Sequence, residues 1–308
     1  MSFLVKKIKE SNMAINTKIQ SKGLNNTMKS QLKKYFPIFL LPTLIAFIIG
    51  FIWPFLWGIY LSFFKFKTLK FMEFNGFRNY ILAFQDNTFT YSFFFTAVFA
   101  IVVVIIINLS AFFLAYALTS KLKGTTIFRT IFFMPNLIGG IVLAYVWKEI
   151  MNDVIQRLYA SALMLDPNYG FWGLVILLSW QQIGYMMIIY IAGLQNVPID
   201  FVEAAKMDGA SGWQILRKIT IPQIMPSITI CLFLSLTNAF KLFDQNLALT
   251  AGAPNRKTEM LALNIYNAFY SNATNLGIGQ AKAVIFFILV VSISLTQLYI
   301  TRRREVQL

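Results

Sequence analysis

The chain has 308 residues, of which 57% are hydrophobic and only 13% are charged, and it carries a net charge of +15. This composition is too apolar for a soluble globular protein and is typical of proteins that cross a membrane several times. Because the chain contains no histidine and a single cysteine, Cys231, histidine-based catalysis, histidine metal sites and a disulfide framework are excluded.

The first 34 residues are polar and basic, with eight lysines and one acidic residue, Glu10. They lack the short apolar run and the cleavage site of a secretory signal. We therefore expect residues 1–34 to be a retained cytoplasmic tail and residues 35–308 to form one membrane domain. A solvated tail is the simpler interpretation, and binding of the lysines to anionic lipid headgroups is the alternative.

Six apolar stretches follow the tail, and each is long enough to cross about 30 Å of hydrocarbon, for which about 20 helical residues suffice. The predicted spans are residues 36–64, 91–118, 127–147, 171–193, 221–243 and 281–300. Pro42 and Pro54 interrupt the first span. An even number of spans places both termini on the same side of the membrane.

Seventeen lysines and arginines lie in the tail and in the connections on its side, against nine in the opposite connections. Cytoplasmic segments carry the excess of these residues, so both termini and the connection at about residues 195–222 are predicted to be cytoplasmic. The positive charge is therefore a feature of topology, and no soluble basic domain indicates nucleic-acid binding.

The connection at residues 195–222 has the pattern of two short helices joined by a turn. Asp200 followed by Glu203 is similar to a capping box and predicts the start of the first helix. Gly209 tolerates a positive φ and predicts its end, and Ser211 can cap the second helix. Because helices this short are not stable alone in water, we expect the spans to hold them on one side and a docked partner on the other.

The same connection resembles the cytoplasmic coupling loop of the permease subunits of binding-protein-dependent ABC importers. The family signature is Glu-Ala-Ala, three residues, Gly, nine residues and Ile-x-Leu-Pro. It is matched by Glu203-Ala204-Ala205, Gly209 and Ile219-Thr220-Ile221-Pro222, with Ile221 in place of the usual Leu. A surface helical hairpin without a partner is the alternative.

This resemblance implies the architecture of a type I ABC importer permease, which is all-α, with six transmembrane helices, both termini inside and a cytoplasmic coupling helix. It also implies which residues transmit motion from an ATPase. The expected coupling residues are Glu203, Ala204, Ala205, Met207, Asp208, Gly209, Ile219 and Pro222.

Three further segments resemble permeases of the maltose and multiple-sugar type. They are Gly76-Phe77-Arg78-Asn79-Tyr80, Phe128-Arg129 with Met134-Pro135, and Leu249-Thr250 with Gly252-Ala253-Pro254. Ala253 stands where the family usually has glycine, so a turn that relies on a second left-handed glycine is expected to be altered. The resemblance implies a carbohydrate importer, for an oligosaccharide, and an importer of a non-sugar solute is the alternative.

Polar side chains within the spans indicate where a substrate would pass, because they usually face the bundle interior or a wet cavity. Gln181 and Tyr185 lie one turn apart on the fourth span, and Ser235 and Asn238 follow a similar spacing on the fifth. Amides can donate and accept hydrogen bonds as sugar hydroxyls require, and an aromatic ring can lie against a pyranose.

The resemblance carries the sugar-binding role to seven positions on these two spans. They are Gln181, Gln182, Tyr185, Ser235, Asn238, Ala239 and Leu242. For each polar residue the alternative is a hydrogen bond that holds two helices together. A further alternative is that a partner permease supplies every contact with the sugar.

No phosphate-binding loop of the type Gly-x4-Gly-Lys-Ser/Thr occurs in the chain, so we do not expect an enzyme. The resemblance implies two separate cytoplasmic ATPase subunits that bind ATP and Mg, a second and different permease subunit, and an extracytoplasmic solute-binding protein. It implies a multi-pass protein of the plasma or inner membrane, without a cofactor, a metal or nucleic acid of its own.

Two other classes of protein remain as alternatives. A self-contained secondary carrier would couple transport to ions, yet no aspartate or glutamate lies near the middle of any predicted span, which argues against proton coupling. A membrane scaffold or sensor would bind an ATPase without moving solute. Neither alternative explains the spaced motif of the coupling loop.

Overall fold

The computed structural model describes residues 35–303, apart from residues 39, 69–71, 121–123 and 271–274. The predicted cytoplasmic tail, residues 1–34, lies outside the described residues. The chain divides into two compact units, Met1–Tyr60 and Leu61–Leu308. Most of the described residues are helical.

The first unit contributes one long apolar helix. Helical residues run from Tyr35 to Leu61 and include a π-helical turn, η1 (Ile48–Ile52), followed by α2 (Trp53–Leu61). The π-helical turn ends just before Pro54, whose nitrogen has no hydrogen to give to a helical ladder. The first predicted span is therefore a helix, although it ends three residues earlier than predicted.

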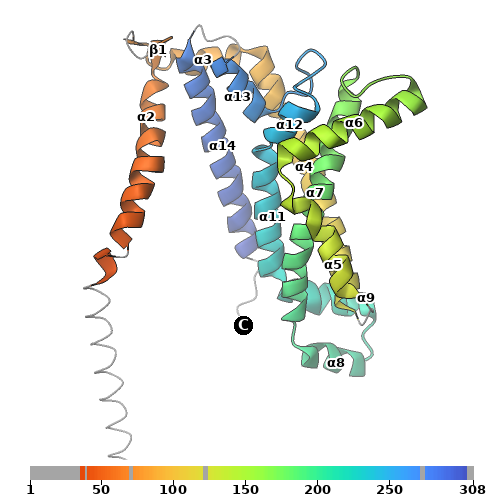
Figure 1. Ribbon diagram of the computed structural model, residues 1–308. Coiled ribbons are helices and arrows are strands. Elements are labelled where there is room, and N and C mark those ends of the chain that lie inside the picture. Colours follow the sequence, from red (N-terminus) through yellow and green to blue (C-terminus); the bar gives the residue numbers. More distant parts are fainter. Residues whose placement is uncertain (1–34, 39, 69–71, 121–123, 271–274, 304–308) are drawn as a thin grey trace, which may run out of the picture. The chain divides into compact units, whose positions relative to one another are not determined.

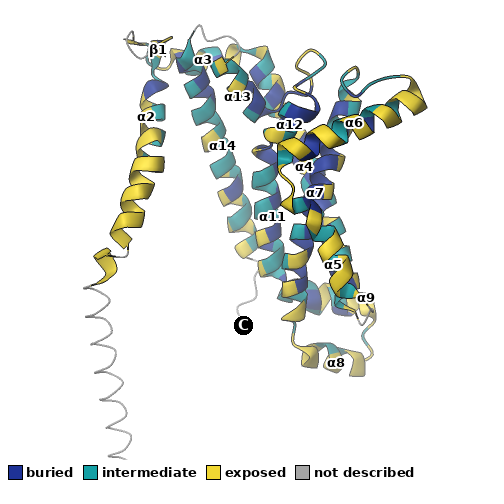
Figure 2. Ribbon diagram, in the orientation of Figure 1, coloured by how far each residue is buried: buried dark blue, intermediate teal, exposed yellow. Residues whose placement is uncertain are grey.

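The second unit is built around three helices, α4 (Asn87–Thr119), α7 (Pro167–Gln195) and α11 (Met225–Phe240), which pack on one another. A fourth long helix, α14 (Leu276–Arg302), packs on α11 (Figure 1). Fully buried side chains such as Val103 of α4 and Leu177 of α7 fill the space between them (Figure 2). The second, fourth and sixth predicted spans are each confirmed as a single helix.

The third predicted span, residues 127–147, is wrong as a single helix. The chain forms α5 (Thr125–Phe133) and a short 3-10 turn, η2 (Met134–Leu137), then bends by 100° into α6 (Gly140–Tyr159). Pro135 lacks an N–H, and Ile138 has an extended backbone, so the ladder of helical hydrogen bonds stops between the two arms.

The fifth predicted span, residues 221–243, is wrong at its start. α9 (Gly212–Ile215), a π-helical turn η3 (Leu216–Thr220) and α10 (Ile221–Gln223) meet α11 at a bend of 71°. Ile224 lies between two nearby prolines and leaves the helical conformation. By length and composition, four described helices could each cross a membrane, or up to six if each bent pair is one span.

The bent third span lies close against the centre of the bundle at Gly184 of α7. A β-carbon at this position would lie 1.8 Å from the carbonyl oxygen of Phe132 on α5. No larger residue fits without moving α5, because the obstructing atom belongs to the backbone.

Smaller elements gather where α4 and α14 begin (Figure 1). They are β1 (Phe64–Phe66), β2 (Met72–Phe74), α3 (Arg78–Gln85) and α13 (Leu261–Tyr270). We call this the hairpin end, and the opposite end, with α8 (Ile199–Met207), the coupling-loop end. A further short helix, α12 (Asp244–Leu249), packs on α6 and α7.

The antiparallel pairing of β1 with β2 means that the all-α prediction is wrong in this detail. Phe64 lies opposite Phe74, and Lys65 lies opposite Glu73. Each strand alternates an apolar, a charged and an apolar residue, which is the pattern of a short strand. An alternation this short does not stand out in the sequence beside long apolar stretches.

Asn79, within the segment that resembles sugar permeases, connects the hairpin to α14. Its Nδ2 donates to the carbonyl oxygens of Ser62 at 2.8 Å and Phe64 at 2.9 Å. Its Oδ1 accepts from Asn75 at 3.1 Å and from Asn275, the N-cap of α14, at 3.0 Å. Since Asn79 is fully buried, this motif residue has a structural role.

Replacing Asn79 by alanine should lower the free energy of unfolding by about 1–3 kcal/mol, because buried polar groups of the hairpin would lose their partner. Thermal unfolding of the purified protein in detergent measures the effect. Arg78→Ala, at the exposed neighbouring position, is the matched control. Equal unfolding temperatures for the two variants would contradict the role assigned to Asn79.

Candidate functional site

The predicted coupling helix is α8, which lies at the coupling-loop end beyond α7 (Figure 1). Its N-cap is Pro198, without a capping side chain, so the predicted capping box of Asp200 and Glu203 is wrong. Asp200 instead lies within the first turn, where a negative charge is favourable beside the positive end of the helix dipole. Pro198 suits this start because it has no N–H that would need a partner.

The turn after α8 is closed by its own backbone. Gly209 has a φ of +77°, and its N–H bonds to the carbonyl oxygen of Lys206 at 3.1 Å. The N–H of Ala210 bonds to the carbonyl oxygen of Ala205 at 2.9 Å. These two bonds form a Schellman motif, which requires a left-handed residue at the position of Gly209. The prediction that Gly209 ends the first helix is confirmed.

The second short helix begins with a full capping box. The Ser211 hydroxyl accepts from the N–H of Gln214 at 3.3 Å, and the Gln214 side chain accepts from the N–H of Ser211 at 2.7 Å. The predicted cap at Ser211 is confirmed. Ile215 and Ile224, both buried, fix this helix and its continuation to the spans.

Most of the predicted coupling residues lie on the outside of this loop. Glu203, Ala204, Met207, Asp208 and Gly209 are exposed, with Met207 at 88%. Ala205, Ile219 and Pro222 are half-buried.

Two clefts keep α8 apart from the rest of the chain. One, of about 400 Å³, lies between α8 and the second short helix and is lined by Ala205 and Ile219 among others. The other, of about 540 Å³, separates α8 from the ends of α4 and α7. An apolar, protruding helix of this kind is typical of a surface that another protein covers.

Gln181 and Gln182 lie near the middle of α7 and belong to two amide pairs. Gln181 donates to the carbonyl oxygen of Ile138 at 3.0 Å and accepts from Gln245 of α12 at 2.8 Å. Gln182 accepts from Asn238 of α11 at 3.2 Å. Gln182 and Asn238 are therefore paired beside Gln181, which itself contacts the bend between α5 and α6.

Burial does not separate the predicted substrate residues from one another. Gln181, Gln182, Ser235, Ala239 and Leu242 are all buried, and Tyr185 and Asn238 are half-buried. Ser235 accepts from Asn108 of α4 at 2.8 Å, and Asn108 accepts from the hydroxyl of Tyr190 at 2.8 Å. Ser235 thus makes the interhelical hydrogen bond that was the alternative to a substrate contact.

Sequence reasoning missed Asn108, Tyr190 and Gln245. Asn108 is a lone amide within a long apolar span, which is itself a signal of a buried partner or a cavity. Gln245 lies just beyond residue 243, the predicted end of the fifth span. It belongs to α12, which follows α11 after a short break. Its nearness to Gln181 depends on the fold of that connection and has no signal in the local sequence.

The connection after the fifth span is fixed by buried polar contacts. Thr258 donates to the carbonyl oxygen of Ala253 at 2.6 Å, and its own carbonyl accepts from Asn246 at 2.7 Å. The left-handed residues of this connection are Ala251, Gly252, Asn255 and Arg256, while Ala253 does not have a positive φ. The replacement of the family's second glycine by Ala253 therefore needs no left-handed conformation.

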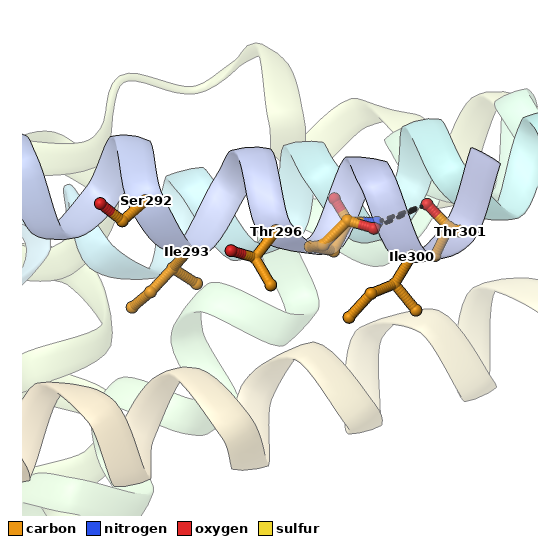
Figure 3. A pocket seen from close by; sticks show the side chains of 6 residues that line it. Ser292, Ile293, Thr296, Ile300 and Thr301 are labelled. Carbon is orange, nitrogen blue, oxygen red and sulfur yellow. Dashed lines mark hydrogen bonds between the residues drawn. The ribbon is translucent and has the colours of Figure 1, made fainter. Parts of the chain in front are cut away.

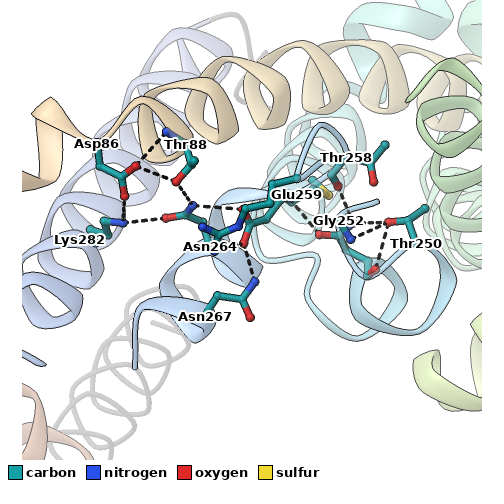
Figure 4. A network of polar contacts seen from close by, with 12 residues as sticks. Asp86, Thr88, Thr250, Gly252, Thr258, Glu259, Asn264, Asn267 and Lys282 are labelled. Atoms are coloured by element: carbon teal, nitrogen blue, oxygen red, sulfur yellow. Dashed lines mark hydrogen bonds and ion pairs between the residues drawn. The ribbon is translucent and has the colours of Figure 1, made fainter. Parts of the chain in front are cut away.

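A polar network at the hairpin end joins α3, α4, α13 and α14 (Figure 4). Lys282, 4% exposed, lies 2.6 Å from Asp86 and donates to Asn264 at 3.1 Å. Asn264 donates to the buried carboxylate of Glu259 at 3.3 Å, and Glu259 also pairs with Arg256 at 2.9 Å. Burial would raise the pKa of Asp86, but hydrogen bonds from Lys282 and Thr88 and the charge of Lys282 outweigh it and lower that pKa.

A groove of about 480 Å³ runs along α14 and, unlike the polar network, is mostly apolar (Figure 3). All of its lining residues belong to this one helix: Ser292, Ile293, Thr296, Gln297, Ile300 and Thr301. Among the described residues, the buried Oε1 of Gln297 has no hydrogen-bond partner. A shallow, mostly apolar groove on a single helix is not the enclosed site that a sugar needs.

The ion pair of Asp86 with Lys282 makes stability depend on pH. Because the pKa of Asp86 is lower in the folded protein than its ordinary value of 3.8, the pair adds stability above that pH. That stability is lost as the pH falls through the lowered value. Unfolding temperature measured from pH 5 to pH 2 should fall more steeply for the wild-type protein than for Asp86→Asn, and parallel curves would contradict the pair's contribution.

Comparison with known proteins places these features in a family. The family model of the binding-protein-dependent transport system inner membrane component matches residues 124–306, which include the coupling loop and both amide pairs. The probable starch degradation products transport system permease protein AmyD of Thermoanaerobacterium thermosulfurigenes is 43% identical over 281 residues, covering 89% of this chain and 96% of that protein. The multiple sugar-binding transport system permease protein MsmF of Streptococcus mutans is 30% identical over 291 residues, covering 91% and 100%.

A solved structure shows the same fold at lower identity. A chain of a bacterial ABC transporter involved in the import of the acidic polysaccharide alginate has a TM-score of 0.75 and 20% identity, over 90% of this chain and 98% of that chain. The family match over more than half of the chain and the 43% identity to a near full-length relative agree. The chain therefore belongs to the family of binding-protein-dependent transport system inner membrane components.

Proposed function

We propose that this chain is a permease subunit of an ABC importer and forms, with a second and different permease, the path for an oligosaccharide. The observation that carries the proposal is the 43% identity, over nearly the whole chain, to a protein named for the transport of starch degradation products. A solved alginate transporter of the same fold is bound to a periplasmic protein that holds an alginate pentasaccharide, which supports delivery by a binding protein.

The proposed topology has six spans with both termini in the cytoplasm of the cell, in a plasma or inner membrane. Four described helices could span a membrane singly, and the two bent pairs supply the other two spans. The excess of lysine and arginine on the side of the coupling loop supports a cytoplasmic position for α8. The hairpin end then faces outward, toward the solute-binding protein.

The exposed coupling loop supports the proposal that ATP is hydrolysed by separate subunits and that this chain receives the resulting motion. The chain is not an enzyme, and two cytoplasmic ATPase subunits bind ATP and Mg and grip the exposed side of α8. Glu203, Ala204 and Met207 lie on that side, while Ile215 and Ile224 anchor the loop in the chain. Closure of the ATPases moves this loop as a rigid body and switches the access of the path between the two sides.

Gly209→Val should abolish sugar uptake, because a β-branched residue is strained in the left-handed conformation by roughly 1–2 kcal/mol and would displace α8 from the ATPase. Gly212→Val is the matched control, since a β-carbon at Gly212 meets open space and its φ is negative. Uptake of labelled sugar and ATP hydrolysis by the assembled transporter measure the effect. Wild-type uptake by Gly209→Val would refute the coupling role.

The proposed substrate contacts are Gln181, Gln182, Tyr185 and Asn238, joined by Gln245. The four amides form two bonded pairs through adjacent residues of α7, and each has donor or acceptor capacity beyond the bonds that it forms. Ser235, Ala239 and Leu242 are proposed to hold the helices that carry these contacts. The hydroxyl of Ser235 bonds to Asn108 and to carbonyl oxygens of its own helix, and Ala239 and Leu242 have no polar side-chain group.

Gln181→Ala and Gln245→Ala should each raise the sugar concentration needed for half-maximal uptake by about tenfold, which corresponds to the loss of one hydrogen bond of about 1.4 kcal/mol. Ser235→Ala should lower the unfolding temperature and leave that concentration unchanged. Uptake measured across sugar concentrations, with unfolding temperatures of the same variants, separates the two roles. The substrate role of the amides fails if the two glutamine variants affect only stability.

The alternatives predict different behaviour of the purified protein. A self-contained carrier would transport solute in vesicles without any ATPase. An importer of another solute class would show ATP hydrolysis stimulated by that solute and its binding protein, with no response to oligosaccharides. Co-purification from the native membrane, followed by an assay of stimulated ATP hydrolysis against a panel of solutes, distinguishes both from the proposed function.

A further inference from the structure

One face of α4 is apolar and exposed along most of its length. The large exposed residues on this face are Tyr91, Phe94, Val98, Ile101, Ile105, Leu109, Phe113 and Tyr116. At 3.6 residues per turn they fall within a stripe about 120° wide. We call it the α4 stripe.

The length of the α4 stripe matches the thickness of a bilayer. From Phe94 to Phe113 the helix rises by about 29 Å, close to the hydrocarbon thickness of about 30 Å. Tyr91 and Tyr116 lie at its two ends, and tyrosine is enriched at the two interfaces of a membrane. The α4 stripe therefore indicates where lipid begins, with the hydrocarbon boundary near Phe94 at the hairpin end.

α3 leads directly into this helix, because Asp86 separates α3 from α4 and serves as the N-cap of α4. One edge of α3 is fixed to the protein: Asn79 and Ala83 are fully buried, and the helix packs on α14. The other edge is apolar and exposed. Phe77 is 71% exposed, Ile81 56% and Phe84 63%, at the i, i+4, i+7 spacing of one helix face.

The depth of α3 follows from the length of the helices beside it. Asn87, where α4 begins, is about 10 Å beyond Phe94 along the helix axis, which is at the outer edge of a headgroup layer about 5–8 Å thick on each side. Asp86, at the end of α3, pairs with Lys282 in the second turn of α14. α14, on which α3 packs, is about 40 Å long, so its first turn also reaches the headgroup layer. An exposed apolar helix edge at this depth lies beside the lipid headgroups.

We propose that α3 is an interfacial anchor, with Ile81, Phe84 and its N-cap Phe77 within the headgroup layer of the leaflet at the hairpin end. The partner is the phospholipid surface itself. Helices with one apolar and one polar edge bind membranes in this way. Arg78, exposed on the flank of α3, is suited to the phosphates of the headgroups.

The single cysteine of the chain makes a direct test possible. Cys231 is fully buried, so an introduced surface cysteine can be spin-labelled selectively. Labels at Phe77→Cys and Ile81→Cys are compared with Ile101→Cys, in the middle of the α4 stripe, and with Glu73→Cys, on the exposed strand β2. The complete transporter in phospholipid vesicles is then exposed to oxygen, which concentrates in lipid, and to a water-soluble nickel complex.

The proposal expects the ratio of oxygen to nickel collisions at Phe77→Cys and Ile81→Cys to lie between the ratios of the two controls. A ratio equal to that of Glu73→Cys would place α3 in water and overturn the proposal. Exclusion of both reagents would show that another protein, such as the second permease or the binding protein, covers this edge, and would overturn it as well. Either result would leave the proposed transport function untouched.

Discussion

Inside a membrane, a polar group gains stability only from partners within the protein or a wet cavity, because lipid offers none. The bend between α5 and α6 is an example, because it leaves backbone groups without helical partners. Where the helical ladder stops, the carbonyl oxygen of Ile138 accepts from Gln181, and Gln181 in turn accepts from Gln245. The broken helix, the amide on α7 and the position of α12 are thus one arrangement, and no part of it is satisfied without the others.

The overall plan of the chain could be predicted from sequence because it depends on local properties. Apolar length located α4, α7 and α14, and the spacing of Glu203, Gly209 and Pro222 located the coupling loop. The bends could not be predicted, because apolar content does not record direction and a proline such as Pro135 interrupts a helix without fixing the angle. The hairpin was missed because three-residue strands are too short to stand out beside long spans.

The roles of the polar residues in the spans could be predicted only in part. Gln181 and Ser235 carry the same signal in the sequence, a polar group in an apolar helix, yet their partners differ. Ser235 is enclosed by Asn108 and Tyr190 from two other helices, whereas Gln181 lies at the break of the third span. Which partner a side chain meets is set by contacts far apart in the chain, and a single sequence does not record them.

The turn between α8 and α9 satisfies its own backbone through the Schellman bonds of Gly209 and Ala210 and the reciprocal bonds of Ser211 and Gln214. A segment that is already ordered loses little conformational entropy when it enters a complex. Docking of the proposed ATPase subunits can then be specific with a modest contact area. It can also be reversed without melting the loop, so that the proposed subunits separate and reassemble as intact folded pieces.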